Sequence, residues 1–379
     1  MRTQRTAAER WPGWAAWALA IGLFMALWLY CADLFPWAAD YPKSLRIPAA
    51  RWITAVTKWL LNDATFGIFT FSEFTRFIAA LLDVPYRFVL SLISTGFLRG
   101  EGSQAVQILP PLSWVAVIGC GAILGQRAGG RRLAALVVGC LAFVLVFGQW
   151  QSAMVTLASI LVAVPLGVAG GLLMGILAFR NPWFERAIRP VLDLMQTIPV
   201  FAYLVPILIL FGFGPTAAVV ATLIYAMPPM TRITELALRR VPSELIDLGH
   251  MVGCTRRQMM WRVMVPASKD ALMVGVNQVI MLSLNMVIIA SMIGAGGLGY
   301  EVLAALRRLD IGTGIEAGLA IVALAIALDR LSQALARRAS AQHHATEQPK
   351  GLFAAHPYTM AAVLLVIATG IAGLAVPAG

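Results

Sequence analysis

The chain has 379 residues, of which 60% are hydrophobic and only 12% are charged, and its mean hydropathy is +0.80. Soluble domains are about 45–50% apolar and about 25% charged, so this composition excludes a cytosolic enzyme, a disordered chain and a collagen-like repeat. The sequence therefore predicts an all-α polytopic membrane protein, because helices satisfy their own backbone hydrogen bonds in lipid.

A basic N-terminus precedes an apolar run at residues 14–32. A cleaved signal peptide has a shorter core of about 7–15 apolar residues and ends at small residues, whereas this run is longer and ends in Tyr30, Cys31, Ala32 and Asp33. We interpret it as an uncleaved spanning helix.

Further apolar runs suit the length of about 17–25 residues that a membrane-spanning helix needs. The run at 112–126 is the shortest, and the segment at 88–98 is expected to lie on the membrane and not to cross it. The nine candidate spans are 14–32, 112–126, 133–149, 154–179, 191–212, 215–231, 271–294, 314–335 and 358–378.

The positions of the basic residues orient these spans, because loops rich in Lys and Arg stay in the cytoplasm. With a cytoplasmic N-terminus and alternating spans, the short outer loops hold only Arg307 and Arg308, and the inner loops hold many basic residues. The excess of 29 Lys+Arg over 18 Asp+Glu is thus explained by topology, and nucleic-acid binding is not expected.

Within the long outer segment 33–111, apolar residues recur at helical spacing opposite Arg51, Thr54 and Lys58. This pattern predicts an N-terminal amphipathic helix in the membrane interface, with its tryptophans at headgroup depth. The alternative is a small extracytoplasmic helical pair packed on its own partners. The apolar residues are Trp52, Ile53, Val56, Trp59 and Leu60.

Signs of catalysis or cofactor binding are scarce. The sequence G-x-x-x-x-G-K-[ST] does not occur, so the chain has no P-loop for ATP. A G-x-G-x-x-G match at Gly294, Gly296 and Gly299 follows an apolar helix and no strand, so we interpret it as a flexible or tightly packed turn. No H-E-x-x-H or CxxC spacing is present. We therefore expect no catalytic residue, metal site or cofactor.

The cytoplasmic loop 232–270 stands apart, because apolar residues alternate with a basic surface and Gly249 and Gly253 interrupt a short helix pair. We interpret it as a helix parallel to the membrane that offers an apolar face to a groove on a soluble partner. From the pattern alone, an amphipathic helix that only caps the bundle is equally acceptable. The residues on the offered face are Leu245, Ile246, Leu248 and Met251.

The same loop resembles one in the membrane permeases of ATP-binding-cassette (ABC) importers, which has the form E-A-A, three residues, G, nine residues, I-x-L-P. Here Asp247-Leu248-Gly249 is followed at the same spacing by Gly253 and by Val263-Met264-Val265-Pro266. The departures are Asp for Glu and Leu-Gly for Ala-Ala. The positions that this resemblance implies for contact with the ATPase are Asp247, Leu248, Gly249, Gly253, Val263, Val265 and Pro266.

The resemblance extends over residues 193–335, in segments such as DLMQTIPVFAYLVPILILFGFG and GVNQVIMLSLNMVIIASMIGAGGLG. These look like the permease of glycine betaine/proline betaine importers, a group that also has choline and carnitine members. An amphipathic N-terminal element is also known in this group.

The resemblance implies a type I ABC importer fold, a permease homodimer in the bacterial inner membrane, two cytosolic ATPases that hold ATP and Mg, and an extracytoplasmic substrate-binding protein. The permease itself would be non-catalytic. Gly249 and Gly253 would allow close approach to the ATPase, and Pro266 would end the helical segment before the next span.

For a methylated ammonium substrate, the pathway should be weakly polar, and tyrosines could offer cation–π faces. Buried Asn and Gln equally often join helices by hydrogen bonds. The candidate pathway residues are Gln196, Tyr203, Tyr225, Asn277, Gln278 and Asn285.

Two functions from other classes were weighed: a secondary carrier or channel that works without an ATPase, and a polytopic membrane enzyme. The predicted organisation is a cytoplasmic N-terminus with the first span at 1–32, an interfacial segment at 33–111, two accessory spans at 112–150, an importer core at 151–336, a cytoplasmic linker at 337–357 and an extra span at 358–379.

Overall fold

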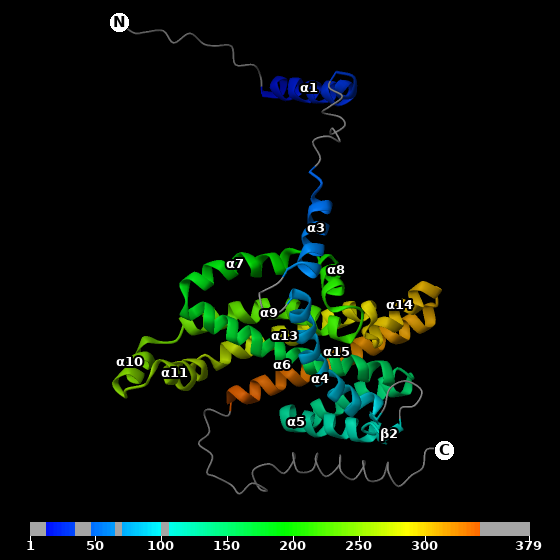
Figure 1. Ribbon diagram of the computed structural model, residues 1–379, viewed down its shortest axis with the longest axis vertical. Helices are drawn as coiled ribbons and strands as arrows, with labels where there is room; N and C mark the ends of the chain where they lie inside the picture. Colours follow the sequence, from blue (N-terminus) through cyan, green and yellow to red (C-terminus); the bar gives the residue numbers. More distant parts are fainter. Residues whose placement is uncertain (1–12, 35–46, 65–69, 100–105, 342–379) are drawn as a thin grey trace. The chain divides into compact units, whose positions relative to one another are not determined.

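The computed structural model describes residues 13–34, 47–64, 70–99 and 106–341, and it divides into two units, Met1–Phe71 and Ser72–Gly379 (Figure 1). Nearly all described elements are helices, apart from one two-stranded hairpin. The all-α prediction is confirmed.

In the first unit, α1 (Gly13–Leu34) coincides with the predicted span 14–32, but the apolar helix counted within it, Trp17–Ala26, is shorter than a span. α3 (Ala49–Asn62) is the predicted amphipathic helix. No residue of α3 is buried, and its tryptophans are exposed. The interfacial helix and the helix packed on its own partners both stay predictions.

The second unit begins with α4 (Phe71–Leu90), a π-helical turn η2 (Ser91–Thr95) and an antiparallel hairpin of β1 (Phe97–Arg99) and β2 (Val106–Leu109), in which Leu98 pairs with Gln107. The remaining elements, in chain order, are α5 (Trp114–Val146), α6 (Trp150–Arg180), α7 (Pro182–Thr197), α8 (Val200–Phe211), α9 (Pro215–Arg239), α10 (Ser243–Met251), α11 (Arg256–Gln258), η4 (Met259–Met264), α12 (Val265–Ala267), α13 (Lys269–Ala290), η5 (Ser291–Ala295), α14 (Leu298–Arg308) and α15 (Ile311–Ala341).

α5 consists of two antiparallel limbs, because Gly130 leaves helical geometry at φ +79° and ψ −170°. A Cβ at Gly121 on the first limb would lie 3.1 Å from Val137 on the second, whereas a straight helix would separate these residues by roughly 24 Å. The two helices predicted at 112–126 and 133–149 are therefore present as separate segments.

The expectation of nine spans is not met. Among the described residues, five helices are long and apolar enough to cross a membrane, and the bent pair of α7 and α8 could supply a sixth. α5 counts once in this number, and α9 does not count, since Pro228, Pro229 and Arg232 lower its hydropathy. The predicted span 358–378 lies outside the described residues.

The predicted span 191–212 is wrong as a single helix, because α7 and α8 are bent by 109° relative to each other. The break falls at Ile198, which is extended at φ −65° and ψ 131°. Pro199 follows, and proline disfavours helical geometry in the residue before it. Hydropathy averages over this break and cannot detect it.

The prediction that residues 88–98 lie on the membrane surface is also wrong, because most of this segment continues α4 into a candidate span, Phe71–Thr95. The run contains charged side chains, and it is still apolar enough to cross a membrane. One of them, Asp83, pairs with Arg87 at 2.5 Å and accepts a hydrogen bond from Thr216 Oγ1 at 3.2 Å. Local pairing of this kind lowers the cost of charges in a largely apolar helix.

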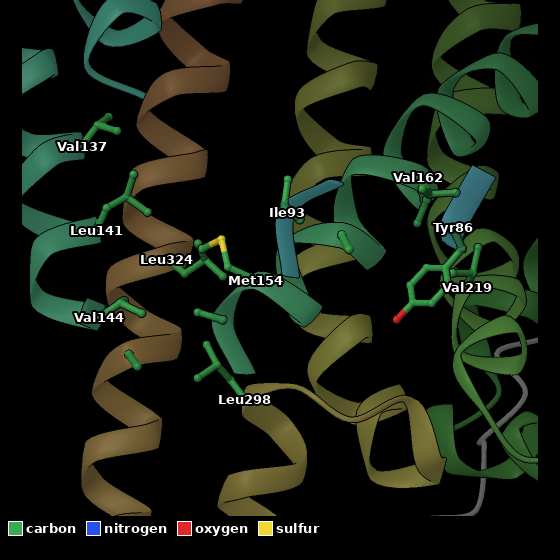
Figure 2. Packing of buried hydrophobic residues seen from close by; sticks show 14 residues of the cluster. Tyr86, Ile93, Val137, Leu141, Val144, Met154, Val162, Val219, Leu298 and Leu324 are labelled. Carbon is green, nitrogen blue, oxygen red and sulfur yellow. The ribbon is translucent and has the colours of Figure 1, made fainter. Parts of the chain in front are cut away.

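The largest core cluster joins α4 and η2 to α5, α6, α9, α14 and α15 (Figure 2). Tyr86 of α4 inserts between Val162 of α6 and Val219 of α9, and Met154 of α6 faces Leu324 of α15. α4 is therefore an integral part of the bundle.

α6 and α9 approach each other closely along a face of glycines. Gly167, Gly171 and Gly175 are spaced four residues apart on α6, and a Cβ at Gly175 would lie 2.7 Å from the Thr231 carbonyl oxygen and 2.5 Å from Thr234 Cβ. Small residues at this spacing let membrane helices pack backbone against backbone.

We predict that Gly175→Ala lowers the stability of the protein by about 1–3 kcal/mol, because the added methyl group overpacks this contact. Thermal unfolding in detergent micelles measures the effect. The matched control is Gly318→Ala on α15, where a Cβ would meet no atom within 4 Å; it should be neutral or stabilising by up to about 1 kcal/mol through helix propensity. Equal melting temperatures for the two variants would contradict the prediction.

Candidate functional site

Most arginines of the second unit gather at one end, here named the arginine-rich end. Figure 1 shows α10 and α11 at this end, and α14 and β2 at the opposite one. The turn of α5 reaches it too, because a Cβ at Gly129 would lie 3.5 Å from Ala334 of α15. The loops predicted to be cytoplasmic thus lie on one side of the bundle.

The α9–α13 loop (residues 240–268) folds into two short arms, and the first ends in a Schellman cap. Gly253 has φ +78°, its N–H donates to the His250 carbonyl at 3.0 Å, and the Cys254 N–H donates to the Gly249 carbonyl at 3.0 Å. This left-handed conformation costs residues other than glycine about 1–2 kcal/mol, which explains why a glycine occupies position 253.

The second arm starts with a capping box at Thr255 and Gln258. Thr255 Oγ1 accepts from the Gln258 N–H at 3.3 Å, and Gln258 Oε1 accepts from the Thr255 N–H at 2.9 Å. From α11, helical geometry continues to Ala267 and breaks at Ser268. The helical segment, predicted to end at Pro266, ends at Ala267, so Pro266 itself lies in its last turn.

Gly249 holds the two arms together. It is buried, and a Cβ there would lie 2.8 Å from Met259 Sδ. The close approach that the sequence suggested toward a partner is therefore made within the chain, against the second arm. Gly253, by contrast, is exposed, with open space around it.

The base of the loop rests on the ends of α6 and α9. Met259, Met260 and Met264 are buried with Ile176 of α6 and Leu238 of α9. Ile246, Val263 and Val265 are partly buried against the same cluster. Of the four residues predicted to face a partner, Ile246 therefore packs inward.

The other three predicted residues are exposed. Leu245, Leu248 and Met251 lie on the outer side of α10, and the Met251 side chain is 83% exposed. Asp247 is exposed beside them. This outer side of α10, together with Val252, is named the α10 face, and nothing in the described part of the chain covers it.

A row of ion pairs, named the α7–α9 ladder, crosses from α7 to α9 next to the loop. Arg239 Nη2 lies 2.5 Å from Glu185 Oε2 and 3.0 Å from Glu235 Oε1, and Arg189 lies 2.5 Å from Glu185 Oε1. Asp193 pairs with Arg232.

Sequence reasoning did not identify the ladder as a unit, although a signal was present. Glu185, Arg189 and Asp193 recur every fourth residue, and Arg232, Glu235 and Arg239 alternate in charge at helical spacing. Two such stripes on neighbouring antiparallel helices predict pairing. The glycine spacing on α6 was a second overlooked signal.

The six candidate pathway residues do not meet in one described hollow. Gln278 and Asn285 share an exposed side of α13, whereas Asn277 accepts a hydrogen bond from Ser332 Oγ of α15 at 3.3 Å and so joins helices. Tyr225 packs against the core beside α8. Gln196 is exposed on α7, and the Tyr203 side chain lies outside the described residues.

The glycine match at 294–299 forms a tight turn at the opposite end, in line with one of its two expected forms. Gly294, Gly296 and Gly297 all have positive φ. The Leu298 N–H donates to Thr156 Oγ1 at 2.9 Å, which pins the turn to α6. Among the described residues, no group of His, Cys, Asp and Glu is arranged to hold a metal ion.

Residues 167–341 match a sequence model of the family described as "Binding-protein-dependent transport system inner membrane component". This range includes part of α6, the α7–α9 ladder, the α9–α13 loop and α15.

Curated relatives are similar over most of the chain. The glycine betaine/proline betaine transport system permease protein ProW of Escherichia coli is 44% identical over 291 residues, covering 77% of this chain and 76% of ProW. The glycine betaine/carnitine transport permease protein GbuB of Listeria monocytogenes is 35% identical over 79% of this chain and 100% of GbuB. The trimethylamine N-oxide transport system permease protein TmoV of Ruegeria pomeroyi is 38% identical over 83% of this chain, but this chain spans only 46% of TmoV.

A solved inward-facing structure of the MetNI methionine ABC transporter also matches. The match has a TM-score of 0.44 and 22% sequence identity, and it covers 48% of this chain and 92% of that chain.

We predict that Gly253→Val loosens the α9–α13 loop by about 1–2 kcal/mol, because a β-branched residue is strained at φ +78°. In this variant, hydrogen exchange at the backbone amides of positions 253 and 254 should be roughly 5- to 30-fold faster than in the unchanged protein. Gly253→Asn, which tolerates the left-handed conformation, is the control and should exchange slowly. Similar exchange in both variants would show that the cap does not hold the loop.

Proposed function

Because the chain belongs to the family of binding-protein-dependent transport system inner membrane components, we propose that it is the membrane permease of an ABC importer with the type I fold. The observation that carries the proposal is the exposed α10 face, on a loop whose base is packed against α6 and α9. A chain without a P-loop needs such a contact to receive work from an ATPase.

Two cytosolic ATPases bind ATP and Mg in this proposal, and two copies of the permease form the pathway. Each α10 face fits a groove on one ATPase, as amphipathic helices do in helix-in-groove contacts. The base of the loop is packed on α6 and α9, so movement of the ATPase is passed to these helices. Gly249 and Gly253 act by shaping the loop, and Leu248 and Met251 supply contact area.

The arginine-rich end is cytoplasmic in this proposal, by the positive-inside rule. The predicted cytoplasmic N-terminus stays a prediction. A cytoplasmic N-terminus requires that only one of α1 and α4 crosses the membrane, because each crossing takes the chain to the other side of the membrane. The binding protein then delivers substrate at the end with α14.

The proposed substrates are glycine betaine, proline betaine or related compounds such as choline, carnitine and trimethylamine N-oxide. The names of ProW, GbuB and TmoV support this class. These compounds share a methylated, positively charged nitrogen that makes no N–H hydrogen bond. Weakly polar walls and aromatic faces suit such a group better than fixed cations do.

Gln278 and Asn285 are the pathway candidates that this geometry supports best. They lie on the same exposed side of α13, which a second copy of the permease would face across the pathway. Asn277 serves as an interhelical contact through Ser332. Gln196, Tyr203 and Tyr225 remain proposals from the sequence.

We predict that Met251→Glu weakens assembly with the ATPase by about 2 kcal/mol, roughly 30-fold, because it places a charge in an apolar contact. The affinity of the purified full-length permease for its ATPase in detergent measures this. Leu309→Glu is the control, since Leu309 is also 83% exposed but lies at the opposite end. Equal affinities for both variants would refute the docking role of the α10 face.

Reconstitution with and without the ATPase distinguishes the classes of transporter. Betaine uptake should require the binding protein, the ATPase and ATP together. Uptake that persists without the ATPase would instead identify a secondary carrier or channel.

We further predict that Asn285→Lys slows uptake of the cation choline roughly 30- to 100-fold, since like charges about 6 Å apart repel by about 2–3 kcal/mol at an effective dielectric of about 20. Zwitterionic glycine betaine should be affected less. Uptake rates at saturating binding protein measure both, and Asn285→Gln is the control. An equal loss for both substrates would indicate a structural role.

A further inference from the structure

A hollow of about 410 Å³ lies between the second limb of α5 and α15 at the arginine-rich end. Its basic lining comes from Arg132, Arg330 and Arg337, and its apolar lining includes Leu136 and Ile326. The hollow contains no residue of the α9–α13 loop and no candidate pathway residue, although Arg337 also lines a neighbouring hollow with Asn277. Its chemistry is therefore not accounted for by the proposed transport function.

The three arginines form no ion pair among the described residues, although Asp270 lines a neighbouring hollow together with Arg337. The ion pairs at this end engage Arg189, Arg232 and Arg239 on the α7–α9 ladder. The acid adjacent to Arg330, Asp329, accepts hydrogen bonds from Gln333 Nε2 at 2.9 and 2.8 Å. Three cationic groups around one hollow therefore favour an anionic occupant.

An exposed apolar stripe on α15 leads into the hollow. Ile315, Leu319, Val322 and Ile326 follow one another at spacings of three and four residues, and all are exposed. The stripe is about 16 Å long at 1.5 Å per residue, roughly half of the ~30 Å hydrocarbon core of a bilayer. It matches the depth of one leaflet.

We propose that this hollow binds an anionic phospholipid. The phosphate group lies among Arg132, Arg330 and Arg337, and one acyl chain follows the stripe of α15 toward the middle of the membrane. Basic pockets between membrane helices are suited to lipid headgroups. The apolar stripe contacts the acyl chain of the lipid, and a free phosphate ion cannot make this contact.

Two other occupants fit less well. An isologous contact with a second copy, centred on the hollow, would bring the arginines against themselves. The segment 358–378 of this chain is apolar, but it contains no Asp or Glu and would leave the arginines without a counter-charge.

The test uses the full-length chain in detergent, titrated with phosphatidylglycerol or phosphatidylcholine and followed by native mass spectrometry. Arg132→Gln/Arg337→Gln should weaken phosphatidylglycerol binding roughly 30-fold, since each basic group near an anionic lipid contributes about 1 kcal/mol and 1.4 kcal/mol is tenfold. The matched control is Arg131→Gln/Arg338→Gln, which removes the same charge from neighbouring exposed positions that do not line the hollow. It should leave binding unchanged.

A conservative pair and a mapping experiment complete the test. Arg132→Lys/Arg337→Lys should retain most of the binding, which shows that the glutamine variant has not simply lost its fold. A photoreactive amino acid at Val322 should cross-link to phosphatidylglycerol in nanodiscs.

Several results would overturn the proposal: equal weakening by the two glutamine pairs, equal binding of phosphatidylcholine, displacement of the lipid by inorganic phosphate alone, or cross-links from Val322 to residues 358–378 or to a second copy. The assay contains no ATPase or transport substrate, so its failure would leave the proposed transport function untouched.

Discussion

The close approach of α6 and α9 is the contact on which the rest of the second unit depends. Lipid gives no hydrophobic drive for helices to associate, so backbone proximity at Gly171 and Gly175 must supply dense packing instead. That contact fixes the ends of both helices, and Ile176 and Leu238 at these ends form the floor of the α9–α13 loop. A displaced α9 would carry the loop with it.

Charge is distributed to support the same end of the bundle. Glu185 and Glu235 have side chains only 13% exposed, so they need the arginines of the α7–α9 ladder as partners. The ladder ties the amphipathic α7 to α9 directly beside the loop. Arg132 of α5 and Arg330 and Arg337 of α15 form no such ion pair in the described chain, which separates a structural group of cations from a group that is open to a ligand.

Features set by local sequence could be predicted, and features set by tertiary contacts could not. The helices, the α10 face and the turn at Gly294–Gly297 follow from spacing over a few residues. The 109° bend at Ile198–Pro199 was missed because a hydropathy window averages over a proline break. The apolar length of α4 was underestimated, although the helix stays apolar enough to cross a membrane with Asp83 and Arg87 in it. Ile246 and Gly249 were assigned to a partner because the sequence does not show that Met259 folds back onto them.

The internal hydrogen bonds of the α9–α13 loop determine which forces on α10 the loop can transmit to the bundle. A flexible linker transmits compression only after it has collapsed, and it transmits tension only after it is fully extended. The Cys254 amide donates to the Gly249 carbonyl, and Ser268 Oγ donates to the Ala237 carbonyl of α9 at 3.3 Å, so the first arm is closed on itself and the second is tied to α9. A push and a pull on α10 would therefore both be transmitted to α9 and α13. The α9–α13 loop could then act in both the closing and the opening step of a transport cycle.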